Sequence, residues 1–359
     1  MSGLWQVGRI AGTPIKVHWS AALLPVLAVA YAVYYDIGED GVLWLQLFVL
    51  ATLLSVLLHE LGHAVAARYF GVPVHDIVLL AVGGAARLRR LPDSPRDEAL
   101  VAFAGPLVNA LLALAMLPAL FLWPQEDWLP WLSNYTTRSF LATLGLFNAA
   151  VFAFNLIPVF PLDGGRLVRA TLATGMTRLR ATKAVSGITR VLALGALAYA
   201  VYEGSFLVGG FAIYAFLAAG REVRGARVRS FLDQRTVGEV ALPVRVFDPE
   251  TPLRDVRQQL IRNGQRGAVI ADECSPIGFV TLEMLDAADD PDAPERHVGD
   301  LELLTVLCHD SDTPLRALTQ QFSQHPASIA IEEIDHRPAG WADLSILEEA
   351  FGAPERAEE

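Results

Sequence analysis

Long apolar stretches dominate the first two thirds of the chain. A helix needs ~20 apolar residues to cross the hydrocarbon core of a bilayer, and six stretches approach that length. They cover residues 18–35, 43–66, 99–122, 139–160, 185–202 and 206–220. The pattern predicts a polytopic α-helical membrane domain with six transmembrane helices.

Residues 72–92 interrupt this helical pattern. The segment reads VPVHDIVLLAVGGAARLRRLP, which is too short and too rich in valine and glycine for a spanning helix. Extended or irregular backbone is tolerated at membrane depth only where protein covers it. The segment is therefore expected to form a short re-entrant or interfacial β segment within the membrane domain.

The apolar pattern ends near residues 225–232, and the charge changes there as well. Up to residue 231 the chain carries 18 Lys and Arg against 13 Asp and Glu, whereas the remainder carries 10 against 26. The acidic part holds two copies of one pattern, which begin with TVGEV and HVGDL and have the apolar spacing of β-α-β-β-α units. We expect a membrane domain over residues 1–225 and a separate cytosolic α/β domain of two modules over residues 232–355.

The overall composition narrows the class of protein. A hydrophobic content of 53% with only 19% charged residues excludes an ordinary soluble enzyme and indicates a protein that has the lipid bilayer as its main solvent. With a net charge of −11, no nucleic-acid partner is expected. The two cysteines, Cys274 and Cys308, imply no disulfide framework.

Basic residues are confined to alternate loops between the predicted helices. Residues 36–42, 123–137 and 203–205 contain no Lys or Arg, whereas the intervening loops, such as residues 87–96, are rich in Arg. Basic residues accumulate on the cytoplasmic side of membrane proteins. The pattern therefore predicts a multi-pass protein of the cell membrane with its N-terminus and its acidic tail in the cytoplasm.

Two histidines and a glutamate lie inside the second apolar stretch, in the sequence LLHELGHAVAARYF. An ionisable group in hydrocarbon costs at least ~2.5 kcal/mol, so these three groups need a compensating partner. On a helix, His59 and His63 lie one turn apart on the same face, where both imidazoles can bind one metal ion beside Glu60. The alternative is a pair of core histidines hydrogen-bonded to other helices.

The metal interpretation requires a further ligand. A catalytic zinc usually takes three protein ligands, and Asp163, in NLIPVFPLDGGR, lies at comparable depth near the end of the fourth stretch. Pro158 and Pro161 are expected to break that helix, which would turn Asp163 inward and leave Asn155 facing the same cavity. The alternative for Asp163 is an ion pair with Arg166 at the helix end.

The sequence resembles the site-2 proteases, zinc metalloproteases that cut substrates inside the bilayer. The motifs that carry the resemblance are HELGHA (59–64), AVGGAARL (81–88), EALVAFAGPLVNALLAL (98–114) and FNLIPVFPLDGGRL (154–167). The resemblance implies one catalytic zinc with His59, His63 and Asp163 as its ligands. It also implies that Glu60 is the general base and acid, and that Asn155 steadies the substrate or the oxyanion.

The same chemistry can be reasoned from the residue types. A metal-activated water can give its proton to a neighbouring carboxylate such as Glu60, which returns it to the leaving amine. The backbone carbonyls of a membrane helix are held in intrahelical hydrogen bonds, so a single-span membrane substrate must unwind before attack. The unwound segment could then pair with a strand edge in residues 72–92. Asn109 is expected to form an interhelical hydrogen bond. The sequence thus predicts endopeptidase cleavage near the cytoplasmic side, in regulated intramembrane proteolysis.

The acidic repeat resembles a CBS pair, a module that in many proteins binds adenine nucleotides in the cleft between its halves. Family members usually show Gly-x-x-Thr-x-x-Asp, in which Thr and Asp hold the ribose. This chain keeps Gly278 and Thr281 but has Met284 at the Asp position, and its second copy keeps only Gly340. Adenine-nucleotide binding at Thr281 and a structural or homodimerising role are both open.

Two other functions are compatible with these residues. A CBS-regulated transporter or channel would use His59, His63 and Asp163 as an ion site. A non-cleaving binder of membrane helices would need neither zinc nor Glu60. Replacing Glu60 while keeping the ligands separates these functions from proteolysis, because Glu60 is not expected to bind the metal. The sequence identifies neither the substrate nor the signal that triggers cleavage.

Overall fold

The computed structural model describes residues 3–10, 12–81, 83–121, 137–272, 275–288, 296–324, 329–334, 337–343 and 346. The chain divides into two compact units, Met1–Arg224 and Gly225–Glu359. They are called the helical unit and the C-terminal unit below. The assignment of a metalloprotease domain to residues 1–225 and of a tandem CBS domain to residues 232–355 stays a prediction.

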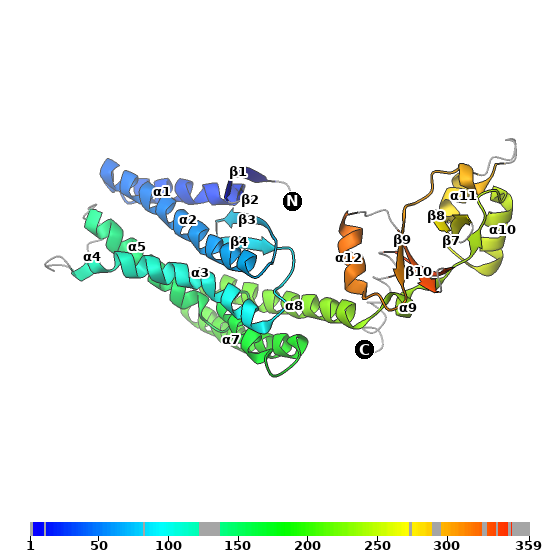
Figure 1. The fold of residues 1–359 in the computed structure, drawn as a ribbon. Helices are drawn as coiled ribbons and strands as arrows, with labels where there is room; N and C mark the ends of the chain where they lie inside the picture. The colour runs from blue at the N-terminus through cyan, green and yellow to red at the C-terminus, as the bar shows by residue number, and fades with distance from the viewer. Residues whose placement is uncertain are drawn as a thin grey trace. The chain divides into compact units, whose positions relative to one another are not determined.

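The helical unit is a bundle of helices (Figure 1). The helices are α1 (Leu23–Tyr34), α2 (Gly38–Tyr69), α3 (Pro95–Met116), α4 (Pro118–Phe121), α5 (Thr137–Asn155), α6 (Asp163–Leu172), α7 (Arg178–Glu203) and α8 (Phe206–Gln234). Helix α3 packs against α2, α5 and α6. Small residues such as Ala64, Ala67, Ala102 and Ala113 are buried, which allows the helix backbones to approach closely.

The length of the helices bears on the predicted number of spans. Among the described residues, four helices are long and apolar enough to cross a membrane, namely α2, α3, α7 and α8. The first and fourth predicted stretches form shorter apolar helices, Trp19–Tyr34 and Ser139–Asn155. Helical structure is thus confirmed in all six stretches, whereas a count of six spans stays a prediction.

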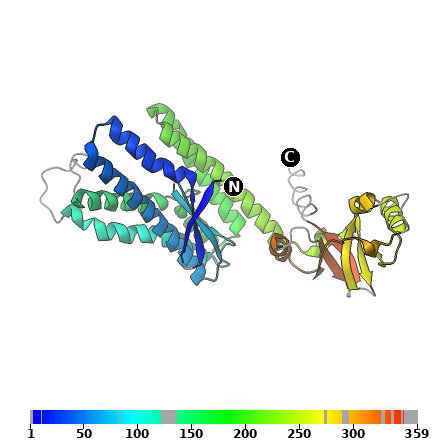
Figure 2. The ribbon, with the colours of Figure 1, turned by 90° about the horizontal axis from the view of Figure 1, so that it is seen from above.

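Four strands form a small sheet in the helical unit, at the end of α2 in both views (Figures 1 and 2). The strands are β1 (Leu4–Ile10), β2 (Thr13–His18), β3 (Val74–Leu80) and β4 (Gly83–Leu88), paired in that order. The β structure predicted for residues 72–92 is confirmed by β3 and β4, while its re-entrant placement stays a prediction. The parallel pairing of β2 with β3 was not anticipated, because it joins segments about sixty residues apart.

A buried carboxylate ties three strands of this sheet together. Asp76 on β3 is fully buried and accepts hydrogen bonds from Arg87 on β4 and from Lys16 on β2, the latter at 2.8 Å. The hydrogen bonds from Arg87, followed by the bond from Lys16, lower the pKa of Asp76 to about 2. The sheet therefore holds β4, its edge strand, in a defined place beside α2.

The described residues of the C-terminal unit form two sheets and several short helices. The strands are β5 (Leu242–Pro243), β6 (Val246–Phe247), β7 (Gly267–Asp272), β8 (Ser275–Thr281), β9 (Val306–Asp310), β10 (Ile329–Ile334) and β11 (Arg337–Ala342). The helices are α9 (Val237–Val240), α10 (Leu253–Asn263), α11 (Leu282–Ala288) and α12 (Leu315–Gln324). The sheet orders are β6-β7-β8 and β5-β11-β10-β9.

The predicted repeat is visible in the connections between these strands. In each copy a parallel strand pair is joined by a helix, β6-α10-β7 and β9-α12-β10, and is followed by an antiparallel hairpin, β7-β8 and β10-β11. Phe279 and Trp341, on equivalent strands, pack ring against ring at 4.7 Å. The β-α-β-β order expected for a CBS pair is confirmed. The final predicted helix lies almost entirely outside the described residues.

Candidate metal centre

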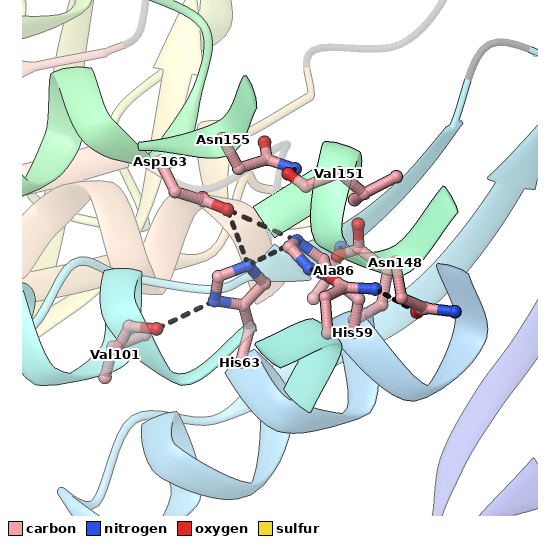
Figure 3. Close-up of polar contacts among 10 residues, drawn as sticks. His59, His63, Ala86, Val101, Asn148, Val151, Asn155 and Asp163 are labelled. Atoms are coloured by element: carbon pink, nitrogen blue, oxygen red, sulfur yellow. Dashed lines mark hydrogen bonds and ion pairs between the residues drawn. The ribbon is translucent and has the colours of Figure 1, made fainter. Parts of the chain in front are cut away.

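The two histidines of HELGH converge on one point with an aspartate from another helix (Figure 3). The Nε2 atoms of His59 and His63, one turn apart on α2, are 3.1 Å from each other. Asp163, the first residue of α6, brings its Oδ2 to 3.2 Å from both Nε2 atoms. All three residues are buried. Within the described part of the chain, they form the one group of His, Cys, Asp or Glu that could hold a metal ion.

The protonation of the histidines shows why this point attracts a cation. His63 Nδ1 donates to the carbonyl oxygen of Val101 at 2.7 Å, and His59 Nδ1 donates to Asn109 Oδ1 at 2.5 Å. In its neutral form, each imidazole then presents a lone pair at Nε2. Two lone pairs and a carboxylate oxygen within 3.2 Å repel one another unless a metal ion lies among them or one imidazole takes up a proton.

The spacing of the donor atoms suits zinc. Ligands ~2.0–2.1 Å from a tetrahedral zinc lie ~3.3 Å apart, close to the 3.1 and 3.2 Å separations observed. Two imidazoles and one carboxylate are also a donor set of catalytic zinc sites, which keep a fourth position for water or substrate. The residues that are present fit the metal.

A chain of buried amides sets the tautomer of His59. Asn148 Nδ2, on α5, donates to the backbone carbonyl of Leu144, and its Oδ1 accepts from Asn109 Nδ2 at 2.8 Å. Asn109, on α3, must therefore turn its oxygen toward His59. Asn148 also donates to Ser55 Oγ on α2 at 3.2 Å. The interhelical role expected for Asn109 is observed, whereas Asn148 and Ser55 were missed although both are polar residues within apolar stretches.

Glycines make room for the site. A Cβ atom at Gly105, on α3, would overlap the imidazoles of both histidines. One at Gly62, on α2, would lie 2.7 Å from the carbonyl oxygen of Ala104, so the two helices also need a glycine here to approach each other. Gly105 belongs to the FAGPLVN motif, where its spacing to the histidines could not be read from the sequence.

Glu60 faces the sheet instead of the three converging atoms. Its Oε2 accepts the backbone N–H of Ala86, on β4, at 2.6 Å, and the residue is buried. A Cβ atom at Gly84 would lie 2.6 Å from Glu60 Cγ, so the glycine on β4 leaves space for this side chain. The edge strand and the glutamate next to the candidate metal ligands are thus in direct contact.

The broken helix that carries Asp163 is as predicted. Helix α5 ends at Asn155, residues 156–162 form turns, and α6 begins at Asp163. Cβ atoms at Gly164 and Gly165 would collide with the backbone of these turns, which explains why glycines follow the aspartate. The carboxylate points at the imidazoles, while Arg166 is exposed.

Comparisons with known proteins decide the family. Residues 47–129 and 129–198 match peptidase family M50. Rip3 of Mycobacterium tuberculosis, which bears the name of a zinc metalloprotease, is 30% identical over an alignment that covers 91% of this chain and 84% of that protein. The chain belongs to peptidase family M50, the site-2 proteases. The family and the enzyme class predicted from the sequence, a zinc metalloprotease of the membrane, are confirmed.

Two solved structures are similar to parts of this M50 peptidase. A site-2 protease from Methanocaldococcus jannaschii is 28% identical and covers 62% of this chain and 95% of that chain, with a TM-score of 0.47. The CBS domain of a bacterial CNNM/CorC family Mg²⁺ transporter is 16% identical and covers 37% of this chain and 91% of that chain, with a TM-score of 0.31.

Asn155 takes no part in the described contacts of the candidate metal centre. Its Nδ2 donates to the carbonyl oxygen of Val151, one turn back in α5, at 3.1 Å. Figure 3 shows the amide turned along its own helix. The predicted contact of Asn155 with substrate or oxyanion stays a prediction.

Thr281 has a structural contact in the C-terminal unit. Its Oγ1 accepts the backbone N–H of Met284 at 3.3 Å, at the start of α11. Met284, at the position where CBS modules usually have Asp, packs against the apolar core of the first repeat. These contacts explain both side chains without a ligand, so nucleotide binding at Thr281 stays a prediction.

Proposed function

We propose that this M50 peptidase is an intramembrane endopeptidase that uses one zinc ion, held by His59, His63 and Asp163, to cleave a transmembrane protein near its cytoplasmic end. The convergence of two imidazole lone pairs and one carboxylate oxygen within 3.2 Å carries this proposal. We further propose a multi-pass protein of the cell membrane, with the N-terminus and the C-terminal unit in the cytoplasm, that acts in regulated intramembrane proteolysis.

The residues around the site suit peptide hydrolysis. Zinc, when bound, would polarise the scissile carbonyl and make a water molecule acidic. Glu60, adjacent in sequence to a metal ligand, is the group to accept a proton from that water and pass it to the leaving amine. The backbone N–H of Ala86 donates to Oε2 of Glu60, so this hydrogen bond orients the carboxylate and occupies only one of its two oxygens. Asn155 is proposed as a donor to the substrate, by resemblance to the site-2 proteases.

The edge strand β4 provides a place for an extended substrate. It pairs with β3 on one side, and its other edge carries the Ala86 N–H that meets Glu60. Residues 83–86 are glycine and alanine, so side chains do not block an approaching backbone. A substrate helix must unwind to expose a carbonyl, and pairing with a strand edge compensates for the hydrogen bonds it loses.

The C-terminal unit is proposed to have a structural or homodimerising role. The capping contact of Thr281 and the apolar position of Met284 favour this role over adenine-nucleotide binding. Titration of the full-length protein with ATP and AMP tests the alternative. Saturable binding that is lost in Thr281→Val would favour the nucleotide role.

Glu60→Gln is the experiment that tests the proteolytic function. The native protein and the variant are co-expressed with single-span membrane regulators, and new substrate termini are identified by mass spectrometry. The native protein should generate cytoplasmic-side fragments, and the variant should generate none while it keeps native zinc content, because Glu60 is not a ligand. Cleavage that persists in Glu60→Gln contradicts the assigned role. Zinc binding without cleavage in the native protein would favour an ion site or a non-cleaving binder.

A further inference from the structure

A second polar cluster lies in the helical unit, apart from the metal centre, with two buried and two partly exposed members. It consists of Glu98, Arg169, Arg178 and Glu222 and is called the charge quartet. Arg169 donates through Nε to Glu98 and through Nη1 to Glu222, both at 2.8 Å. Arg178 Nη2 forms an ion pair with Glu98 at 2.9 Å. Two carboxylates and two guanidiniums balance in charge, so the quartet is complete without an ion.

The quartet joins four helices. Glu98 lies in the first turn of α3, Arg169 on α6, Arg178 at the start of α7 and Glu222 on α8. The side chains of Glu98 and Arg169 are each 4% exposed, whereas that of Glu222 is 30% exposed. A buried charge that loses its partner is strongly destabilising, so α6 has a defined place among the other helices.

Arg169 connects the quartet to the metal centre. It lies six positions after Asp163 on α6, ~9 Å along the helix axis. Its guanidinium also lies over the ring of Phe160, 5.4 Å from the ring centre, in the turn that leads into Asp163. The backbone N–H of Phe160 donates to Thr189 Oγ1, on α7, at 3.0 Å. Contacts of Arg169 thus hold the chain both before and after Asp163.

Glu222 extends this connection along α8. The helix runs without interruption from Phe206 to Gln234 and passes the boundary between the two units, at Arg224 and Gly225. A shift of α8 along or about its axis moves the Glu222 carboxylate against Arg169. Helix α8, which leads into the C-terminal unit, therefore contacts Arg169 of α6, the helix that begins with the candidate zinc ligand Asp163.

We propose that Arg169 is a positioning residue for the metal centre, and that Glu222 makes the position of Asp163 depend on the position of α8. The proposal rests on the zinc function proposed above. With the quartet intact, Asp163 Oδ2 lies 3.2 Å from both imidazole nitrogens. Without the Glu222 contact, Arg169 loses one of its two carboxylate partners. Helix α6 is then held less firmly, and Asp163 binds the metal more weakly.

The test measures metal coordination in the full-length protein in detergent. Zn²⁺ affinity is measured by chelator competition, and the geometry of the site by the absorption spectrum of the Co²⁺-loaded protein. Glu222→Gln should change the Co²⁺ spectrum and lower Zn²⁺ affinity by at most about tenfold, because tenfold is the lower end for loss of a group hydrogen-bonded directly to a ligand and Glu222 acts through Arg169. Glu222→Asp should restore both toward native values. Glu203→Gln, at the exposed end of α7, is the matched control and should change neither.

Two outcomes overturn the inference, and they differ from failure of the proposed function. Native Zn²⁺ affinity with a native Co²⁺ spectrum in Glu222→Gln would contradict it, as would equal effects in Glu203→Gln. Arg169→Met should have a larger effect than Glu222→Gln, and since Glu222 is partly exposed, its variant decides the matter even where Arg169→Met does not fold. If the native protein binds no zinc, the proposed function itself is wrong.

Discussion

The metal centre and the charge quartet are two polar clusters of the helical unit with opposite electrostatic organisation. In the metal centre, three acceptor atoms from His59, His63 and Asp163 face one another. In the quartet, each carboxylate faces a guanidinium. Burial of charged groups therefore does not by itself mark a binding site. Groups that converge without a counter-charge of their own are better candidates, because such an arrangement needs either a metal ion or a proton on one imidazole to be stable.

Among the variants that separate the two clusters, removal of one candidate zinc ligand is expected to have the largest effect. His63→Ala should abolish zinc binding and proteolysis, because two protein ligands do not hold a catalytic zinc. Chelator competition and a cleavage assay measure both losses. His75→Ala, which removes an exposed histidine on β3, is the control. Native zinc affinity in His63→Ala would remove this histidine from the ligand set.

A change in the quartet should act on stability instead. Glu98→Gln leaves Arg169 and Arg178 without their shared carboxylate and should lower the free energy of unfolding by about 3 kcal/mol. The free energy of unfolding is compared on zinc-free protein by thermal or denaturant unfolding, where His63→Ala should lose less stability than Glu98→Gln. If zinc-free His63→Ala unfolded as readily as Glu98→Gln, the two clusters would not differ as described.

Gly105→Ala should damage the metal centre without removing a ligand. The added methyl group would overlap both imidazoles, so zinc affinity should fall roughly 30-fold, within the range typical of disturbed metal-site surroundings. Gly195→Ala, on α7, is the control because a Cβ atom there meets no neighbour within 4 Å. Equal zinc affinities in the two variants would show that the histidines do not occupy the space next to Gly105.

Asn109→Leu is expected to have the smallest effect. It removes the acceptor of the His59 Nδ1 proton, which frees the imidazole to rotate or to change tautomer, so zinc affinity should fall about tenfold. Asn109→Asp keeps an acceptor and should lose less. A larger loss in Asn109→Asp than in Asn109→Leu would contradict the proposed direction of the hydrogen bond.

The helices and the convergence of the three candidate ligands were accessible to sequence reasoning because they depend on local patterns. One helical turn separates His59 from His63, and the prolines before Asp163 end α5 wherever that helix lies. The break at residues 156–162 and the inward turn of Asp163 were therefore predictable. The repeat of the C-terminal unit was predictable for the same reason, since each copy carries its own alternation of apolar and polar positions.

Features that depend on contacts between distant segments could not be predicted. The pairing of β2 with β3, the space that Gly105 leaves for the histidines and the contact of Arg169 with Glu98 and Glu222 all join residues far apart in the chain. The sequence around Arg169, which is buried on α6, does not distinguish it from the exposed Arg166 on the same helix. These are tertiary properties, decided by packing and not by local pattern.

Zinc K-edge X-ray absorption on native protein purified under gentle, chelator-free conditions tests the central claim most directly. We expect about one zinc per chain with nitrogen and oxygen ligands at ~2.0–2.1 Å and the scattering pattern of two imidazoles. A metal-free protein, or a zinc environment without imidazole, would contradict it.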